Sequence, residues 1–116
     1  MTNFSKLPHE KLVAYQEARA LLACVVEAGI SDARLRDQAL RAARSVCLNI
    51  AEGAGRTSWP DKARVYSIAR GECGEVVAAL DLALLSASCS AGAARAGARH
   101  AEAVYALLSG LIRRAG

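Results

Sequence analysis

The sequence predicts an all-α protein, folded as an up-down-up-down antiparallel four-helix bundle. Alanine, the residue with the highest intrinsic helix propensity, is the most frequent residue type in the chain. Aromatic residues make up only 4% of the 116 residues, and no alternation of apolar and polar residues indicates a β-strand. Short links containing glycine or proline separate four segments of helical periodicity, so residues 1–116 are expected to form one domain.

The first helix is expected over residues 8–28. Pro8 suits a first helical turn, where its missing N–H has no helical partner, and Gly29 suits the position just after a helix. The inward side of this helix is expected to carry Leu12, Tyr15, Leu22, Val25 and Val26.

The second helix is expected over residues 32–54, with Ser31 or Asp32 as its cap and with Gly53 and Gly55 near its end. Its spacing indicates an apolar face of Leu35, Ala39, Ala42, Val46 and Ile50. The opposite, solvated side is expected to carry Arg34, Asp37, Arg41 and Arg44.

The third helix is expected to have Pro60 in its first turn and to continue to about Ser88. Ser58 and Asp61 have the spacing of a capping box, although aspartate is shorter than the usual partner. The inward set is Val65, Ala69, Cys73, Val76, Leu80 and Leu84.

The fourth helix is expected over residues 93–114. Arg113 and Arg114 suit its C-terminal end, where the helix dipole is negative. Its apolar face is expected to consist of Val104, Leu107, Leu108, Leu111 and Ile112.

Small residues follow one side of the third helix, turned away from the inward set. Glycine inside a helix costs about 1 kcal/mol relative to alanine, so two glycines on one face favour close approach of another helix. We therefore predict a subunit interface made of Ser67, Gly71, Gly74, Ala78, Leu82 and Leu85.

The composition favours a cytoplasmic protein that associates with copies of itself. The mean hydropathy of +0.19 is high for a chain that buries its apolar surface alone. The least charged stretch, residues 76–94, contains Asp81 and several serines, so no membrane span is expected. Charged residues such as Lys6 and Glu10 interrupt the start of the chain, and we predict no signal peptide.

The four cysteines do not have the spacing of a metal site. Cys24, Cys47, Cys73 and Cys89 are far apart, and none forms a C-x-x-C pair. Buried free thiols are expected, with no metal and no cofactor.

Polar residues gather where the second helix ends. We predict a structural network that ties this end to the third helix, in which a buried Glu52 must have a partner. No His, Cys or second carboxylate completes an acid–base pair nearby, so no catalytic residue is assigned. The network is expected to comprise Asn49, Glu52, Arg56 and Ser58, joined by Arg70 and Glu75.

Basic residues suggest a surface for RNA or DNA. The chain has a net charge of +4, and guanidinium groups suit phosphate contacts. Trp59 is the one residue suited to stacking on a base. The alternative is a solvated face with no ligand. The candidate nucleic-acid-binding residues are Arg34, Arg41, Arg44, Arg56, Lys62 and Arg64.

One resemblance covers most of the chain and is strongest between about residues 40 and 76. It is carried by the segment Asn49-Ile50-Ala51-Glu52-Gly53 with Arg56 and Ser58, flanked by residues 40–46 and 68–71. This pattern resembles the bacterial four-helix bundle proteins encoded in intervening sequences of large-subunit ribosomal RNA genes. The accessory variability protein of diversity-generating retroelements has a similar bundle.

The resemblance implies a closed bundle that assembles into a ring-like homopentamer. For the retroelement relatives it implies a basic surface that binds nucleic acid and a reverse transcriptase; for the rRNA-associated members it implies no established activity. The chain departs from the pattern at Cys47-Leu48 and at Glu72-Cys73.

Three hypotheses follow. The leading one is a non-enzymatic bundle that self-assembles and contacts nucleic acid or a nucleic-acid enzyme. The second is a purely structural or protein-interaction oligomer with no nucleic-acid role. The third, an enzyme that uses Glu52 and Arg56, requires an open pocket at these residues.

Overall fold

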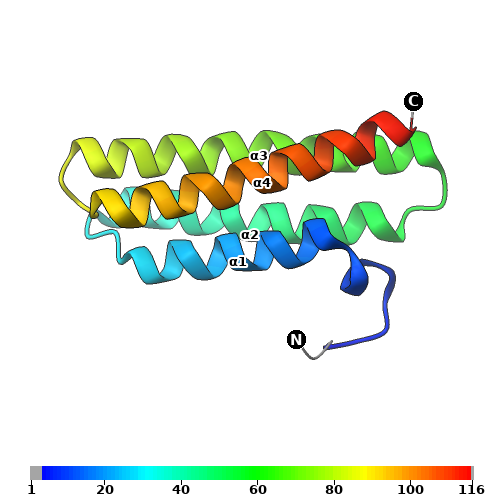
Figure 1. Ribbon diagram of the computed structural model, residues 1–116, viewed down its shortest axis with the longest axis horizontal. Coiled ribbons are helices and arrows are strands. Elements are labelled where there is room, and N and C mark those ends of the chain that lie inside the picture. Colours follow the sequence, from blue (N-terminus) through cyan, green and yellow to red (C-terminus); the bar gives the residue numbers. More distant parts are fainter. Residues whose placement is uncertain (1–3, 116) are drawn as a thin grey trace.

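The four predicted helices form an antiparallel bundle in the computed structural model, which describes residues 4–115. Each helix packs against the next one along the chain, and α1 also packs against α4 (Figure 1). The predicted up-down-up-down four-helix bundle is therefore confirmed. Within the described range the elements are a 3-10 helix η1 (Pro8–Lys11), α1 (Val13–Ala28), α2 (Ala33–Gly55), α3 (Trp59–Leu85) and α4 (Ala91–Ala115).

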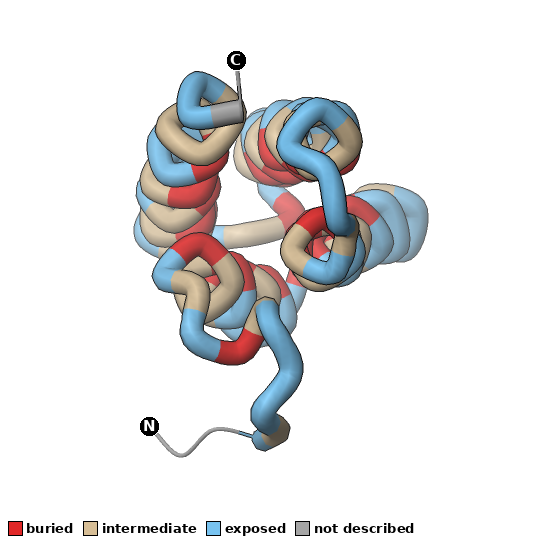
Figure 2. Tube along the Cα trace, turned by 90° about the vertical axis from the view of Figure 1, so that its right-hand side faces the viewer, coloured by how far each residue is buried: buried red, intermediate tan, exposed pale blue. Residues whose placement is uncertain are grey.

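The core lies along the axis of the bundle, and the buried side of each helix faces it (Figure 2). The apolar faces predicted for the second and third helices are confirmed, with Leu35 and Leu84 only partly buried. Alanines fill much of the space between helices, so few large side chains are needed. The largest fully buried side chains include Leu21, Ile30, Ile50, Leu80 and Leu108.

Two apolar residues predicted to face inward point outward instead. Val26 is 60% exposed, because the buried line of α1 ends at Val25, one residue earlier. Leu107 is 36% exposed, because its neighbour Leu108 occupies the core position of α4. One residue corresponds to about 100° of helix rotation, so Val26 and Leu107 point away from the centre when their neighbours Val25 and Leu108 face it.

The first predicted helix does not start as one α-helix at Pro8. Pro8 opens η1, and Leu12 then adopts an extended backbone (φ −71°, ψ 128°) before α1 begins. This break turns Glu10 inward, where its Oε1 accepts a hydrogen bond from the Phe4 N–H at 2.7 Å and its Oε2 accepts one from Ser5 Oγ at 3.2 Å. Glu10 is only 2% exposed.

The links α1–α2 and α3–α4 meet at one end of the bundle (Figure 1). Gly29 adopts the left-handed conformation after α1 (φ 57°), and Asp32 Oδ1 accepts the Leu35 N–H at 2.9 Å, as the sequence predicted. The Ser31 N–H donates to Ser88 O at 2.9 Å and joins the two links. The third helix ends at Leu85, earlier than predicted, and Ala87 reverses the chain with a φ of 58°.

No helix in the described range is both long enough and apolar enough to cross a membrane.

Candidate nucleic-acid and subunit interfaces

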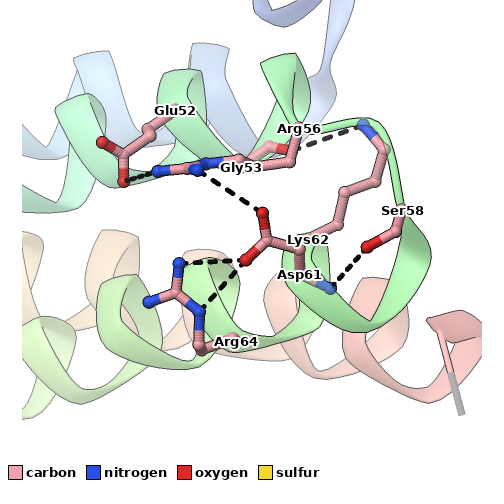
Figure 3. A network of polar contacts seen from close by, with 7 residues as sticks. All are labelled: Glu52, Gly53, Arg56, Ser58, Asp61, Lys62 and Arg64. Atoms are coloured by element: carbon pink, nitrogen blue, oxygen red, sulfur yellow. Dashed lines mark hydrogen bonds and ion pairs between the residues drawn. The ribbon is translucent and has the colours of Figure 1, made fainter.

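The turn between α2 and α3 holds a chain of ion pairs at the end of the bundle opposite to Gly29 (Figure 3). Arg56 Nη2 lies 3.4 Å from Glu52 Oε2, and Arg56 Nη1 lies 3.4 Å from Asp61 Oδ2. Asp61 also pairs with Arg64 at 2.9 Å. Ser58 Oγ accepts the Asp61 N–H at 3.2 Å, so one half of the predicted capping box is present. Of these contacts, the pair between Arg56 and Asp61 joins the end of α2 to the first turn of α3.

Lys62 closes the C-terminal end of α2. Its Nζ donates to Gly53 O at 3.3 Å (Figure 3) and to Ala54 O at 2.7 Å. Both carbonyls lie at the negative end of the helix dipole. Gly53 itself is buried against Tyr66, and neither it nor Gly55 adopts a positive φ. The glycines were expected to cap α2; a lysine from the next helix caps it instead.

The other members predicted for the network have different partners. Asn49 Nδ2 donates to Ser45 O and Ser45 Oγ, both at 3.0 Å, one turn earlier on α2. Arg70 Nη1 donates to Ser109 Oγ at 3.2 Å, and its guanidinium lies over the ring of Tyr105. The structure therefore brings Glu52, Arg56 and Ser58 together and separates them from Asn49, Arg70 and Glu75. The expectation of a buried Glu52 is wrong, since its side chain is 53% exposed.

Glu75 instead lies beside Glu72 in a hollow of about 400 Å³ between α2 and α3. Arg41 and Ser45 line the α2 side of this hollow. Partial burial and the neighbouring Glu75 carboxylate raise the pKa of Glu72, while a hydrogen bond with Ser45 and the charge of Arg41 oppose the rise. The hollow thus contains a pair of carboxylates that one guanidinium only partly compensates.

The six predicted nucleic-acid-binding residues form two groups at different places. Arg34, Arg41 and Arg44 are exposed along the outer side of α2, as predicted. Within the part of the chain that the structure describes, Arg34 and Arg44 form no ion pair. Arg56, Lys62 and Arg64 belong to the turn, where each already has a partner in the protein.

The contact of Trp59 with the end of the fourth helix was not predicted from the sequence. Trp59 opens α3 and is 44% exposed. The Arg114 guanidinium lies 5.4 Å from its ring centroid, and Lys62 Nζ lies 5.8 Å from it. The antiparallel topology creates this cluster, because the end of α4 lies beside the start of α3 (Figure 1). Only the predicted helix directions could have indicated it.

The predicted subunit interface on α3 is exposed along its whole length in the single chain. A Cβ atom added to Gly71 or Gly74 would meet nothing within 4 Å, while Leu82 and Leu85 are 50% and 77% exposed. Hollows adjoin this face on both sides: the one with Glu72 includes Ala78 and Leu82, and another of about 450 Å³, between α3 and α4, includes Gly74.

The cysteines are free thiols; Cys47 and Cys73 are buried, and Cys24 and Cys89 are half-buried. Burial raises the pKa of Cys47 to about 11 and that of Cys73 to about 12. In the described residues, no three His, Cys, Asp or Glu side chains come together in a way that could hold a metal ion.

Comparison with known proteins agrees with this architecture. A solved structure from Bacteroides thetaiotaomicron, of a protein with unknown function from the S23 ribosomal protein family, superposes with a TM-score of 0.78. The two chains are 19% identical, and the similarity covers 87% of this chain and 99% of the other. No curated protein matches the chain. The model of the 23S rRNA-intervening sequence protein family matches residues 10–110, and the chain belongs to this family.

Proposed function

We propose that this protein is a non-enzymatic, cytoplasmic bundle that assembles with copies of itself and binds nucleic acid through a basic surface. The observation that carries the proposal is the exposed face of α3. Gly71 and Gly74 leave open space there, and Leu82 and Leu85 expose apolar surface to water. Covering such a face releases water from apolar area and lets a second backbone approach closely. A closed ring of five copies is the assembly that the family resemblance implies.

The α3 face is suited to a partner helix for a second reason. The hollows of about 400 and 450 Å³ on its two sides could receive side chains from that helix. Interfaces with good packing fill such spaces at the density of a protein interior. A second copy supplies exposed apolar residues of its own, among them Leu48 and Ile68.

Light scattering after size-exclusion chromatography tests the assembly. We expect a mass of several times 12.1 kDa for the native chain. Gly71→Leu and Gly74→Leu should lower this mass, because the new side chains occupy the space of the partner. Ala23→Leu, at an exposed position of α1, adds equal bulk elsewhere and should leave the mass unchanged. A single species of 12.1 kDa for the native chain in dilute buffer would rule the assembly out.

The nucleic-acid role is supported by the outer side of α2. Arg34 and Arg44 are exposed and without an ion pair in the described chain, so their guanidinium groups are available for phosphates. Assembly would multiply this modest patch. We expect RNA or DNA to bind with an affinity that falls steeply with salt. The slope of log affinity against log salt concentration should become shallower in Arg41→Ala/Arg44→Ala, by about one for each phosphate that is no longer neutralised. Absent or salt-independent binding would contradict this role.

A structural or protein-interaction oligomer is the second candidate. It is favoured by the turn between α2 and α3, where Arg56, Lys62 and Arg64 already have partners within the protein. Two results together would support this candidate over the first. A protein partner should still be captured after nuclease treatment, and the purified chain should bind neither RNA nor DNA.

A further inference from the structure

Trp59 is the one tryptophan of the chain, and two cations lie close to its ring. It opens α3 at the same end of the bundle at which α4 finishes (Figure 1). Its indole is 44% exposed, with Arg114 at 5.4 Å and Lys62 at 5.8 Å from the ring centroid. A partly exposed aromatic ring with two cations near it combines a π-system and positive charge at one place on the surface.

The charge of this end is unbalanced. Asp61 is shared between Arg56 and Arg64, and Glu52 pairs with Arg56, so both carboxylates are already compensated. Arg113 is exposed beside Arg114 in the last turn of α4. The N-terminus of α3, the positive end of its dipole, lies here too. Around the α2–α3 turn and the last turn of α4, the cations are Arg56, Lys62, Arg64, Arg113 and Arg114, against the carboxylates Glu52 and Asp61.

Lys62 and the arginines of α4 have different roles in this cluster. Lys62 is held by two carbonyl oxygens of α2 and serves the fold. Among the described residues, Arg114 forms no ion pair; its guanidinium lies over the Trp59 ring, and a guanidinium in this position can also turn to a phosphate. Trp59 and Arg114, with the exposed Arg113 in the same last turn of α4, therefore form a surface that a ligand can reach without breaking the α2–α3 turn.

We infer that this surface, called here the Trp59 surface, binds single-stranded nucleic acid, with a base stacked on the indole of Trp59 and adjacent phosphates held by Arg113 and Arg114. Bases of a single strand expose the faces that a duplex hides, and each base stacks on an aromatic side chain with little dependence on its identity. The inference rests on the proposed nucleic-acid role. It specifies where on the protein the nucleic acid binds and that the nucleic acid is single-stranded. The α2 face, which has arginines and no aromatic residue, offers phosphate contacts only.

The fluorescence of Trp59 tests this contact directly, because no other tryptophan contributes. The probe is an unlabelled single-stranded oligonucleotide of about a dozen nucleotides, compared with the same sequence as a duplex. We expect saturable quenching by the single strand and much weaker quenching by the duplex. Equal quenching by both, or binding of the single strand with unchanged fluorescence, would overturn the inference.

Variants measured by anisotropy of a labelled single strand provide the second test. Trp59→Leu should weaken binding roughly tenfold, whereas Trp59→Phe should retain most of the affinity, because phenylalanine still stacks. Arg113→Ala/Arg114→Ala should make the slope of log affinity against log salt concentration shallower by about 1.4, since each phosphate of a single strand contributes about 0.7. The matched control is Arg95→Ala, which removes an exposed cation from the opposite end of α4 and should change little. Circular dichroism confirms that each variant is folded.

The two proposals fail in distinguishable ways. Single strands that bind equally well to Trp59→Leu, but less well to Arg41→Ala/Arg44→Ala, would overturn the Trp59 surface and leave the proposed function standing. No binding of any oligonucleotide to the native chain would overturn both.

Discussion

Gly53 on α2 and Tyr66 on α3 pack so closely that a Cβ atom on Gly53 would lie 2.7 Å from Cε1 of the tyrosine ring. Tyr66 is only 3% exposed, so its ring has little room to move away. The missing side chain of Gly53 therefore sets the distance between the two helices. Lys62 caps α2 directly beside this contact, and both features determine where the turn presents its ion pairs.

We expect Gly53→Ala to destabilise the protein by about 1–2 kcal/mol. Overpacking a close contact costs about 1–3 kcal/mol, and the better helix propensity of alanine returns about 1 kcal/mol at most. Gly55→Ala is the matched control, because a Cβ at Gly55 meets nothing within 4 Å. Urea unfolding measures both variants, and a Gly53→Ala protein as stable as the native chain would show that the Tyr66 ring yields freely.

Lys62→Ala should destabilise the protein by about 1 kcal/mol, because the carbonyls of Gly53 and Ala54 lose a charged donor at the end of α2. Arg64→Ala is the comparison, since it removes a cation from the same turn. Its ion pair with Asp61 involves a side chain that is 58% exposed and should contribute less than about 0.5 kcal/mol. Thermal unfolding would contradict the capping role if both variants were destabilised equally.

The fold could be predicted because the helices have clear periodicity and short links. The apolar residues of the second helix recur at helical spacing, and Gly29 and Asp32 mark a helix end and a helix start by local chemistry alone. Neighbouring apolar pairs were the weak point, as with Val25 and Val26, because spacing alone does not determine which of two adjacent residues faces the core.

The polar contacts were harder to predict than the helices. Glu52 and Arg56 are one turn apart on one helix, so their pairing could be expected from spacing. Arg70 pairs with Ser109 and Arg114 with Trp59, in both cases between α3 and α4. Such contacts depend on the register of two antiparallel helices, which the sequence does not reveal residue by residue. Glu10 was missed because a break at Leu12 was not expected.

The segment before α1 should be released at acid pH. The hydrogen bond from the Phe4 N–H, followed by that from Ser5, lowers the pKa of Glu10 below 4.5, even though burial opposes this shift. The charged form is therefore favoured in the folded state. The stabilisation by Glu10 is fully present above pH 4.5 and disappears as the pH falls through the lowered pKa.

Hydrogen exchange of the Phe4 amide, followed by NMR, measures this release. Protection should be high near neutral pH and decrease in acid beyond the intrinsic pH dependence of exchange. In Glu10→Gln the neutral amide oxygen accepts a weaker hydrogen bond and does not titrate, so protection should be lower at neutral pH and should lack the additional decrease in acid. Glu102→Gln, which changes an exposed carboxylate on α4, should behave like the native chain. Equal protection in the native chain and in Glu10→Gln would contradict the prediction.

Glu72 should show the opposite dependence on pH. Partial burial, together with the neighbouring Glu75 carboxylate, raises the pKa of Glu72 above 4.5, so its charge is disfavoured in the folded state. The resulting penalty is fully present above the raised pKa and is relieved as the pH falls through it, until the group is protonated in both states below 4.5. Glu72→Gln should therefore increase the free energy of unfolding at neutral pH.

Urea unfolding of the native chain and Glu72→Gln over a range of pH checks this prediction. The advantage of the variant should shrink as the medium becomes acidic, and Glu75→Gln should give the same sign, because it removes the charge that opposes ionisation of Glu72. Arg41→Ala should instead decrease the free energy of unfolding at neutral pH, since the Arg41 guanidinium is the charge that favours the ionised Glu72 carboxylate. A Glu72→Gln protein that is less stable than the native chain at neutral pH would mean that Ser45 and Arg41 more than compensate the carboxylate pair.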